Sequence, residues 1–344
     1  MSESLLTVRN LRVGFATEAG RLQAVDGVSF DLSPGEVLAI VGESGSGKSV
    51  TAQTIIGLTR SADAQIEGSV RLGDTELVDA SEQLLQGVRG DRIAMVFQDP
   101  MTSFNPVYRI GNQIVEAIRA HRPDSSKAEA RERAVELLDS VGIPNAARRV
   151  DDYPHEFSGG MRQRAMIAMA LALEPEVLIA DEPTTALDVT VQAQILRLLE
   201  QLNRERGLAT ILITHDLGVV AEVADRVLVM YAGRIIEQGT LDEIFYDPQH
   251  PYTWGLLGSL TRLDLPRPHR LPQIGGAPPS LLSLPAGCSF RPRCPHAFGR
   301  CAELPGLDAR LAEAPAHQDR CWLGPETKRE RRVIEGKIGL EAPK

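Results

Sequence analysis

Gly42-Glu43-Ser44-Gly45-Ser46-Gly47-Lys48-Ser49 matches the pattern G-x-x-x-x-G-K-[ST] of loops that hold nucleotide phosphates. Its glycines let successive backbone N–H groups turn toward an anion, and Lys48 adds positive charge near the terminal phosphates. Ser49 offers its hydroxyl to Mg²⁺. The apolar run 37–41 before the loop predicts a strand, and residues 49–58 predict a helix whose N-terminus points at the phosphates. This context favours an ATP or GTP site over a chance match in a loop rich in Gly and Ser.

The chain as a whole has the composition of a folded, water-soluble protein. Its 344 residues suffice for one large or two ordinary domains, and 43% of them are hydrophobic and 24% charged. The net charge of -9 disfavours nucleic acid as a partner. The first residues lack the apolar core of a secretory signal, and the longest apolar run, 165–173, is about half of what a membrane-spanning helix needs. We therefore expect a cytoplasmic protein whose membrane role would come through a partner.

Two kinds of apolar pattern predict two kinds of strand. Residues 6–13 and 24–32 alternate between apolar and polar side chains, which is typical of half-buried antiparallel strands. Continuously apolar runs are typical of strands that are covered on both faces. These runs are 37–41, 93–97, 177–180, 209–214 and 226–230. Together they predict an α/β fold with a mostly parallel sheet, crossover helices and an antiparallel β flank.

The strand pattern stops between about residues 99 and 175, where the periodicity becomes helical. The expected helices of this helical insert are 110–120, 126–141 and 160–173. The insert would belong to an ATPase domain of residues 1–250.

A change of composition near residue 250 predicts a C-terminal extension at 251–325. Pro and Gly are dense between residues 266 and 295, which marks a segment built from turns. Residues 326–344 are charged and weakly patterned, so they are expected to form a loose tail or a single surface helix.

A second nucleotide motif is the apolar strand 177–180, which is followed by Asp181 and Glu182. Asp181 is expected to hold Mg²⁺ through its water shell, and Glu182 to polarise the water that attacks the γ-phosphate. An apolar strand that ends in acids is a weak signal alone, because strand ends commonly carry solvated acids. Its place about 130 residues after a phosphate loop favours one site for phosphoryl transfer.

Phe157-Ser158-Gly159-Gly160-Met161-Arg162-Gln163-Arg164 predicts a second anion site at the start of a helix. Ser158 is a good N-cap, and the paired glycines expose backbone N–H groups. The set of motifs is similar to that of the ATP-binding subunit of an ABC transporter, whose signature sequence resembles Ser158-Gly159-Gly160. This resemblance implies the P-loop NTPase fold of ABC ATPases. It also implies a head-to-tail dimer in which the signature of one subunit, here Ser158 to Met161, completes the ATP site of the other.

The same resemblance implies roles for four more residues. Gln98 matches the Q-loop glutamine that senses Mg²⁺ and the attacking water, and Asp188 of Ala186-Leu187-Asp188 matches the D-loop that passes across the dimer interface. His215 matches the switch histidine that contacts the γ-phosphate, and Phe15 is the candidate for stacking on adenine, at a looser spacing. Alone, Gln98 and His215 would each be interpreted as a polar residue that closes a strand.

The signature departs at both ends from the usual Leu-Ser-Gly-Gly-Gln. Met161 has no amide to offer, but the backbone N–H groups and Ser158 remain, so we expect hydrolysis to survive. This form of the signature resembles that of the peptide-uptake branch of the family. Gln98-Asp99-Pro100-Met101-Thr102-Ser103-Phe104-Asn105-Pro106 resembles the same branch, in the region where these subunits grip their membrane partner.

All four cysteines lie in the extension, with the spacing C-x5-C-x6-C-x19-C: Cys288, Cys294, Cys301 and Cys321. Disulfides rarely persist in the cytoplasm, so a metal site is a better interpretation than a covalent cross-link. Four thiolates suit zinc or an iron-sulfur cluster, and the absence of a close pair such as C-x2-C favours the cluster. Zinc and unligated thiols stay open as alternatives.

Three stretches around the cysteines are similar to the C-terminal extension of oligopeptide and dipeptide transporter ATPases: His250-Pro251-Tyr252-Thr253, Ile274-Gly275-Gly276-Ala277-Pro278-Pro279 and Gly287-Cys288-Ser289-Phe290-Arg291-Pro292-Arg293-Cys294. Members of that group can carry a [4Fe-4S] cluster there. The resemblance thus implies a cluster on the four cysteines. A structural role is expected, since a small Pro-rich extension buries little apolar surface and benefits from a cross-link.

The resemblance covers about residues 5 to 325 and implies an ATP-hydrolysing motor subunit of an ABC importer for dipeptides or oligopeptides. Mg-ATP would clamp two ATPase subunits together, and hydrolysis would let them part. The implied partners are a second ATPase subunit, either a copy or a paralogue, two transmembrane permease subunits and, indirectly, an extracellular peptide-binding protein, with no nucleic acid. The implied location is peripheral, at the cytoplasmic face of the cell membrane.

Other functions stay open from the sequence alone. A soluble ABC-type ATPase of DNA repair or translation is one alternative, but such proteins usually carry long coiled coils, two ATPase units or basic surfaces. A redox sensor whose cysteine cluster gates the ATPase is another. Within the importer hypothesis, nickel chelates and glutathione-like compounds are alternative substrates to peptides.

Overall fold

The computed structural model describes residues 4–99, 103–184, 188–259, 274–309 and 314–334, and it forms two compact units. The first unit contains the chain up to Leu5 together with residues 32–37 and 75–213. The second unit contains residues 6–31, 38–74 and the part from residue 214 onward. Each unit therefore combines segments that are distant in sequence. The domain boundary at residue 250 that the composition predicts does not coincide with the division between these units, and it stays a prediction.

The first unit contains three parallel strands, as the apolar runs predict. β7 (Val177–Asp181) pairs with β6 (Ile93–Val96) on one side and β8 (Ala209–Thr214) on the other, both in parallel. All five residues of β7 are buried, which explains its continuously apolar sequence. α8 (Val189–Arg206) forms the crossover from β7 to β8, and Asp188 caps its N-terminus.

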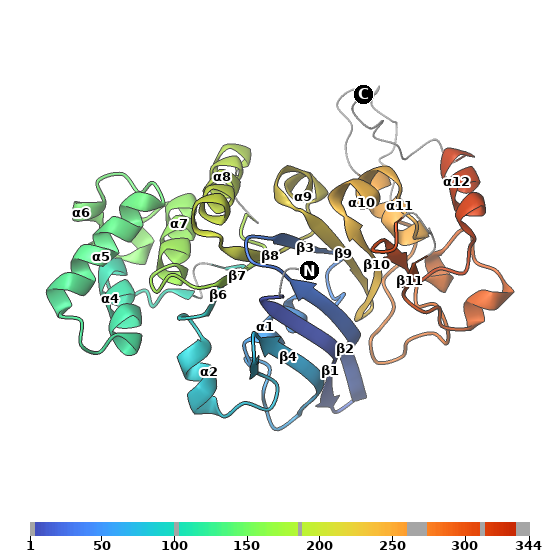
Figure 1. Cartoon of the computed structure of the whole chain (residues 1–344), viewed down its shortest axis with the longest axis horizontal. Helices are drawn as coiled ribbons and strands as arrows, with labels where there is room; N and C mark the ends of the chain where they lie inside the picture. Colours follow the sequence, from blue (N-terminus) through green and yellow to red (C-terminus); the bar gives the residue numbers. More distant parts are fainter. Residues whose placement is uncertain (1–3, 100–102, 185–187, 260–273, 310–313, 335–344) are drawn as a thin grey trace. The chain divides into compact units, whose positions relative to one another are not determined.

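The helices of the insert lie together in the first unit (Figure 1), and their buried side chains share one hydrophobic cluster with residues of β6, β7 and α8. Its long helices are α4 (Ile110–His121), α5 (Lys127–Ser140) and α7 (Gly159–Ala170), which confirms the three predicted helices to within a turn. A capping box between Ser126 and Glu129 starts α5. Shorter elements of this unit are α2 (Glu82–Val88), α6 (Ala146–Arg149) and η1 (Pro154–Glu156).

The second unit contains the antiparallel flank. β1 (Leu6–Thr17) lies between β2 (Gly20–Leu32) and β4 (Ala64–Leu72). The short strand β5 (Thr75–Glu76) belongs to the first unit. β1 and β4 pair in antiparallel register, Leu6 opposite Leu72 and Phe15 opposite Ala64. The apolar side chains of β1 are buried at alternate positions on each side of an irregularity at residues 9–12, as a sheet with one covered face requires.

A second sheet of this unit positions the phosphate loop. β3 (Val37–Val41) is parallel to β9 (Arg226–Tyr231), and β9 is antiparallel to β10 (Arg234–Thr240). The helices are α1 (Lys48–Ile55), α9 (Leu217–Val223) and α10 (Leu241–Tyr246). Side chains of β3, β9 and α9 form the core on one face of these strands.

The C-terminal extension packs on this core and extends its sheet. β12 (Gln318–Asp319) pairs with β10 and with β11 (Asp308–Ala309). The other elements are α11 (Pro251–Gly258), η2 (Arg291–Arg293), η3 (Gly299–Ala302) and α12 (Pro325–Ile334). Within the described part of the predicted tail the chain is helical, and residues 335–344 lie outside the described residues.

A buried ionic cluster fastens the extension to β10. Glu237, which is fully buried on β10, accepts hydrogen bonds from the backbone N–H of His250 at 2.9 Å and contacts Nε2 of His317 at 2.8 Å. Burial alone would raise the pKa of Glu237 and lower that of His317, but their mutual contact outweighs it. The net result lowers the pKa of Glu237 and raises the pKa of His317. The pair is therefore ionised in the folded protein near pH 6.

Glu237→Gln is expected to lower the unfolding temperature most near pH 6. Breaking one side of a buried ion pair costs about 3 to 5 kcal/mol. The stabilisation that protonated His317 contributes is complete below the pKa of the unfolded histidine, and it is lost as the pH rises through the raised pKa of the folded protein. The stabilisation that ionised Glu237 contributes is lost as the pH falls through the lowered pKa of the folded protein. Thermal unfolding at pH 4, 6 and 9, with the exposed Glu222→Gln as control, tests this. A loss that is equal at all three pH values would contradict it.

Candidate functional site

The phosphate loop joins β3 to α1 within the second unit, and at two of its glycines there is no room for a side chain. Gly42 has φ 151° and Gly47 has φ 100°. A Cβ atom on Gly42 would lie 2.2 Å from the carbonyl oxygen of Met230, and one on Gly47 would lie 2.5 Å from that of Ala24. Any side chain here would therefore displace the loop from β9 or β2.

Lys48 begins α1 and is turned back onto the loop. Its Nζ donates to the carbonyl oxygens of Gly42 at 2.8 Å and Glu43 at 3.0 Å, and it lies 3.4 Å from Oγ of Ser46. The side chain is only 6% exposed, so its charge is held at the loop by oxygen ligands. Ser49 follows in the first turn of α1 and is half-buried. This arrangement places a cation and a hydroxyl at a helix N-terminus, as phosphate binding requires.

The two carboxylates at the end of β7 differ in their surroundings, within the first unit. Asp181 is buried, at 4% exposure, while Glu182 is half-buried and has a left-handed φ of 49°. Gln98, two residues after β6, donates from Nε2 to Oε2 of Glu182 at 2.9 Å. A non-glycine residue in this strained conformation is typical of functional sites. The structure thus brings Gln98 to Glu182, as their proposed roles around one water would need.

The signature serine caps α7 in the first unit. Oγ of Ser158 accepts the N–H of Met161 at 3.3 Å, as expected for an N-cap. Gly160 is packed closely, because a Cβ there would lie 2.6 Å from Cγ1 of Val191. Met161 itself packs against the core of the helical insert. Met161, one of the two residues that depart from the usual signature, therefore has a packing role in this chain.

The remaining predicted residues are placed as follows. His215 lies in the second unit, is exposed and directly follows β8. Oδ1 of Asp188 accepts the N–H of Val191 at 3.0 Å, which starts α8, whereas Ala186 and Leu187 lie outside the described residues. Phe15 is half-buried near the end of β1. The catalytic and adenine-binding roles of these residues stay predictions.

The extension contacts the phosphate loop within the second unit, which the sequence did not indicate. The backbone N–H of Glu43 donates to the hydroxyl of Tyr252 at 2.9 Å. Arg293 donates with both terminal nitrogens to the Glu43 carboxylate, Nη1 to Oε2 at 2.6 Å and Nη2 to Oε1 at 3.0 Å. Tyr252 and Arg293 stand in the very stretches that resemble the peptide-transporter extension, but their sequence gives no sign of this contact.

The position of Tyr252 is itself fixed by the first turn of α11. The N–H of Tyr252 donates to Nδ1 of His250 at 3.0 Å. Burial lowers the pKa of His250 to about 4, so its imidazole is neutral and accepts this bond at physiological pH. Burial also raises the pKa of Tyr252, which keeps its hydroxyl protonated.

The four cysteines line one pocket of the extension, although they come from separate turns. The walls include His296 and apolar side chains such as Phe298 and Leu323. Cys301 and Cys321 are buried, and all four are free thiols. Among the residues that the structure describes, no group of three or more His, Cys, Asp or Glu is placed to hold a metal ion. The expected metal centre is therefore not confirmed.

Burial governs the protonation of these cysteines. Burial raises the pKa of Cys288, that of Cys294 to about 11 and that of Cys321 to about 12. These thiols are protonated at neutral pH when nothing is bound, and only a positively charged group would stabilise them as thiolates. The four cysteines therefore share the lining of one mostly apolar pocket, and burial keeps Cys288, Cys294 and Cys321 protonated there.

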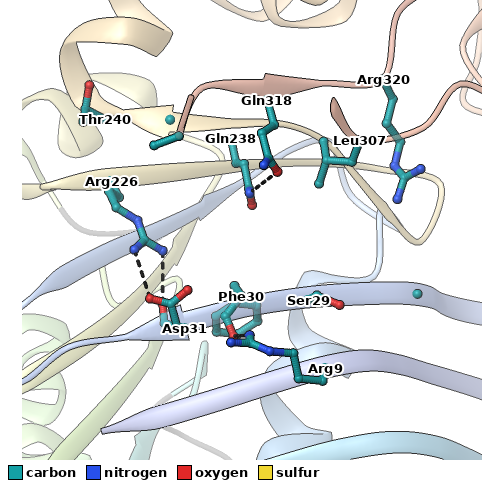
Figure 2. A pocket seen from close by; sticks show the side chains of 13 residues that line it. Arg9, Ser29, Phe30, Asp31, Arg226, Gln238, Thr240, Leu307, Gln318 and Arg320 are labelled. Atoms are coloured by element: carbon teal, nitrogen blue, oxygen red, sulfur yellow. Dashed lines mark hydrogen bonds and ion pairs between the residues drawn. The ribbon is translucent and has the colours of Figure 1, made fainter. Parts of the chain in front are cut away.

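Another cavity of the second unit, of about 600 Å³, contains none of the predicted site residues (Figure 2). Its charged groups already have partners in the protein. Arg226 pairs with Asp31 at 3.4 Å, and Nη1 of Arg9 donates to the carbonyl of Phe30 at 3.0 Å. We therefore assign no ligand to this cavity.

A helix that crosses a bilayer must be both long and apolar. None of the helices that the structure describes combines the length and the apolar character that crossing it would demand.

Two family models match successive parts of the chain. The one described as ABC transporter matches residues 25–185, which include the phosphate loop, the signature and both strand-end carboxylates. The one described as Oligopeptide/dipeptide transporter, C-terminal region matches residues 236–301, which include Tyr252 and Arg293.

Curated relatives match over most of their length. The Dipeptide transport ATP-binding protein DppD of Bacillus subtilis (strain 168) is 52% identical over 336 residues, which are 97% of this chain and 98% of that protein. The Oligopeptide transport ATP-binding protein OppD of Salmonella typhimurium is 54% identical over 305 residues, which are 89% of this chain and 90% of that protein.

Solved structures agree in fold. The dimeric structure of MJ0796, a bacterial ABC transporter cassette, is similar with a TM-score of 0.62 and 30% identity, and the match covers 69% of this chain and 98% of that one. A post-hydrolysis state of the same cassette bound to ADP and Pi matches equally well, with a TM-score of 0.62.

Proposed function

The chain belongs to the ABC transporter family of ATPases, and from this premise we propose that it is the motor subunit that drives the uptake of dipeptides or oligopeptides. The observation that carries this proposal is the joint presence of an ATPase site and the peptide-transporter extension. The phosphate loop, the Gln98–Glu182 pair and the capped signature helix supply the ATPase parts. The match of residues 236–301 to the extension favours peptides over nickel chelates or glutathione-like substrates.

We assign the steps of ATP hydrolysis to these residues by their chemistry. Lys48 and the loop N–H groups bind the phosphates, and Ser49, Gln98 and Asp181 are the candidates for holding Mg²⁺. Glu182 accepts the proton of the attacking water, which Gln98 helps to orient. His215 contacts the γ-phosphate. The assignment of all of them to one Mg-ATP rests on the family and on the order of the motifs.

A second ATPase subunit is needed to complete each site. Ser158, Gly159 and Gly160 present an anion-binding helix N-terminus, and residues 158–161 would close the ATP site of the partner. The dimeric structure of the related MJ0796 cassette supports such an arrangement. Asp188, which caps α8, would lie at the same interface. The partner is a copy of this chain or a paralogue.

The membrane partners would dock on the first unit near Gln98. Val107 and Tyr108 follow the stretch that resembles the peptide-uptake branch, and they are 71% and 56% exposed. Large apolar side chains that face water in adjacent positions are typical of a contact with another protein. We propose that the permease subunits cover them, which would keep the chain at the cytoplasmic face of the membrane.

We also propose a [4Fe-4S] cluster on Cys288, Cys294, Cys301 and Cys321. The pocket supports it because all four cysteines line it, and the spacing supports it because zinc prefers close pairs. When bound, the cluster would act as a cross-link of turns that bury little apolar surface. The four cysteines would hold the cluster, and the apolar side chains beside them would keep water out of the pocket.

Protein purified without oxygen is expected to contain about four irons per chain and to absorb in the visible range. Cys301→Ser should lower the iron content, because it removes a buried ligand, and should lower the unfolding temperature. Metal analysis and absorbance spectra test this. A content of one zinc per chain would contradict the cluster and indicate a zinc site. The absence of any metal would contradict it and indicate free thiols.

Purification of the chain from its native membrane tests the importer function. We expect two permease subunits and a second ATPase subunit to co-purify, and ATP turnover to rise when a peptide-loaded binding protein is added. Recovery without any membrane protein would overturn the proposal in favour of a soluble ATPase. Stimulation by a nickel chelate or glutathione alone would overturn the peptide assignment.

A further inference from the structure

Glu43 of the phosphate loop is held from three directions, two of which come from the extension. Its carboxylate is bound by Arg293, its backbone N–H by the hydroxyl of Tyr252, and its carbonyl oxygen by Nζ of Lys48. We infer that Arg293 is a positioning residue for the ATP site, which acts through Glu43 on the phosphate loop and on Lys48. The inference deepens the proposed function, because it rests on this loop binding ATP.

The guanidinium of Arg293 is fixed on every side. It donates from Nε to the carbonyl of Gly275 at 2.9 Å and from Nη1 to the hydroxyl of Tyr231 at 3.3 Å. It also lies over the rings of Tyr231 and Phe290, with 5.8 and 6.0 Å to their centroids. Its side chain is 4% exposed. A buried guanidinium with two parallel bonds to one carboxylate fixes the direction as well as the distance of that carboxylate.

The contact matters for Lys48 because residue 43 connects the two side chains. The same Glu43 whose carboxylate is clamped by Arg293 accepts a bond from Lys48 through its carbonyl oxygen at 3.0 Å. When the clamp is removed, Glu43 loses its fixed direction and Lys48 loses a well-placed acceptor. Binding of phosphate would then have to order the loop, and that ordering weakens affinity.

The place of Arg293 depends on the turn that carries two of the cysteines. Arg293 ends η2 and directly precedes Cys294, and the N–H of Arg293 donates to the carbonyl of Phe290 at 2.9 Å. The N–H of Cys288 donates to the carbonyl of Cys301 at 3.0 Å, which closes the base of this turn. A change in the conformation of the cysteine-bearing turn would therefore move Arg293, and with it the Glu43 carboxylate that Arg293 binds.

The test compares Arg293→Ala and Arg293→Lys with Arg332→Ala in the full-length chain, assembled with its co-purified partners. Arg332 is the matched control, because it is a largely buried arginine of α12 that pairs with Asp247 at 2.6 Å, outside the phosphate loop. We expect Arg293→Ala to raise the KM for ATP about tenfold or more, and Arg332→Ala to leave it unchanged. Arg293→Lys keeps the charge but loses the two parallel bonds, so its KM should rise as well.

A double-mutant cycle separates positioning from a general loss of stability. Glu43→Gln, Arg293→Ala and the double variant are compared by KM and kcat for ATP and by unfolding temperature. If Arg293 acts through Glu43, the double variant should have about the KM of Arg293→Ala alone, with kcat changed less than KM. Should Arg293→Ala fail to fold, Arg293→Lys and Glu43→Gln still supply the comparison.

Equal KM values for the wild type and all Arg293 and Glu43 variants would overturn the inference, as would effects that multiply in the double variant. A rise in KM that Arg332→Ala shares would show a structural role only and would also overturn it. In each of these outcomes the wild-type chain still hydrolyses ATP, so the proposed function would stand. Failure of the proposed function would instead appear as a wild-type chain that hydrolyses no ATP with its membrane partners.

Discussion

Glu182→Gln is expected to slow ATP turnover about 10²- to 10⁴-fold while ATP still binds, which is the contribution typical of a general base. Glutamine keeps the size of the side chain and can still contact Gln98, but it cannot accept the proton of the attacking water. The Mg²⁺ ligand Asp181 is untouched. Turnover should therefore fall mainly in kcat, with the affinity for ATP retained.

The matched control is Glu176→Gln, at the opposite end of β7. Glu176 forms an ion pair with Arg92 on the surface, and its loss should leave turnover close to that of the wild type. Both variants are compared by phosphate release and by nucleotide binding in the assembled transporter. Wild-type turnover in Glu182→Gln would disprove the role of Glu182 as the base.

Lys48→Ala is expected to weaken ATP binding itself, by roughly 10- to 100-fold. A hydrogen bond to a charged group contributes about 1.5 to 3 kcal/mol, and tenfold in affinity corresponds to about 1.4 kcal/mol. In the folded protein Nζ is already at the loop, between the carbonyls of Gly42 and Glu43, so little ordering is needed when phosphate arrives. Alanine removes this cation without filling its place.

Titration with a non-hydrolysable ATP analogue measures the effect. Lys127→Ala is the control, since Lys127 is an exposed lysine in the first turn of α5. Its replacement should leave the affinity unchanged. Equal affinities of wild type and Lys48→Ala would show that the loop N–H groups alone hold the phosphates. In that case the account of Lys48 would be wrong.

The sequence predicts the elements of the fold well where burial imposes a simple pattern. The fully buried strands β3, β7 and β8 have no polar residue that faces water, and α4 and α5 show their apolar stripes. The pattern does not reveal β4, because only Val70 and Leu72 of this strand are buried. A strand that buries so little leaves no alternation to detect.

The local parts of the candidate site follow from motifs, since a phosphate loop, an N-cap and a strand-end acid are made by consecutive residues. The contacts between distant residues do not follow. Glu43 and Arg293 are 250 positions apart in the chain, and neither has an unusual neighbour that would point to the other. In the same way, only the fold shows that Met161 packs against the buried core of the first unit, which explains why a methionine can stand at this position of the signature.

The most direct test of the account is ATP-driven accumulation of a labelled peptide in vesicles that contain the co-purified complex and its peptide-binding protein. We predict accumulation with wild-type chain and almost none with Glu182→Gln, although both complexes assemble and bind ATP. Accumulation that is equal in the two complexes, or absent with the wild type while ATP is hydrolysed, would contradict the conclusion that this chain powers peptide uptake.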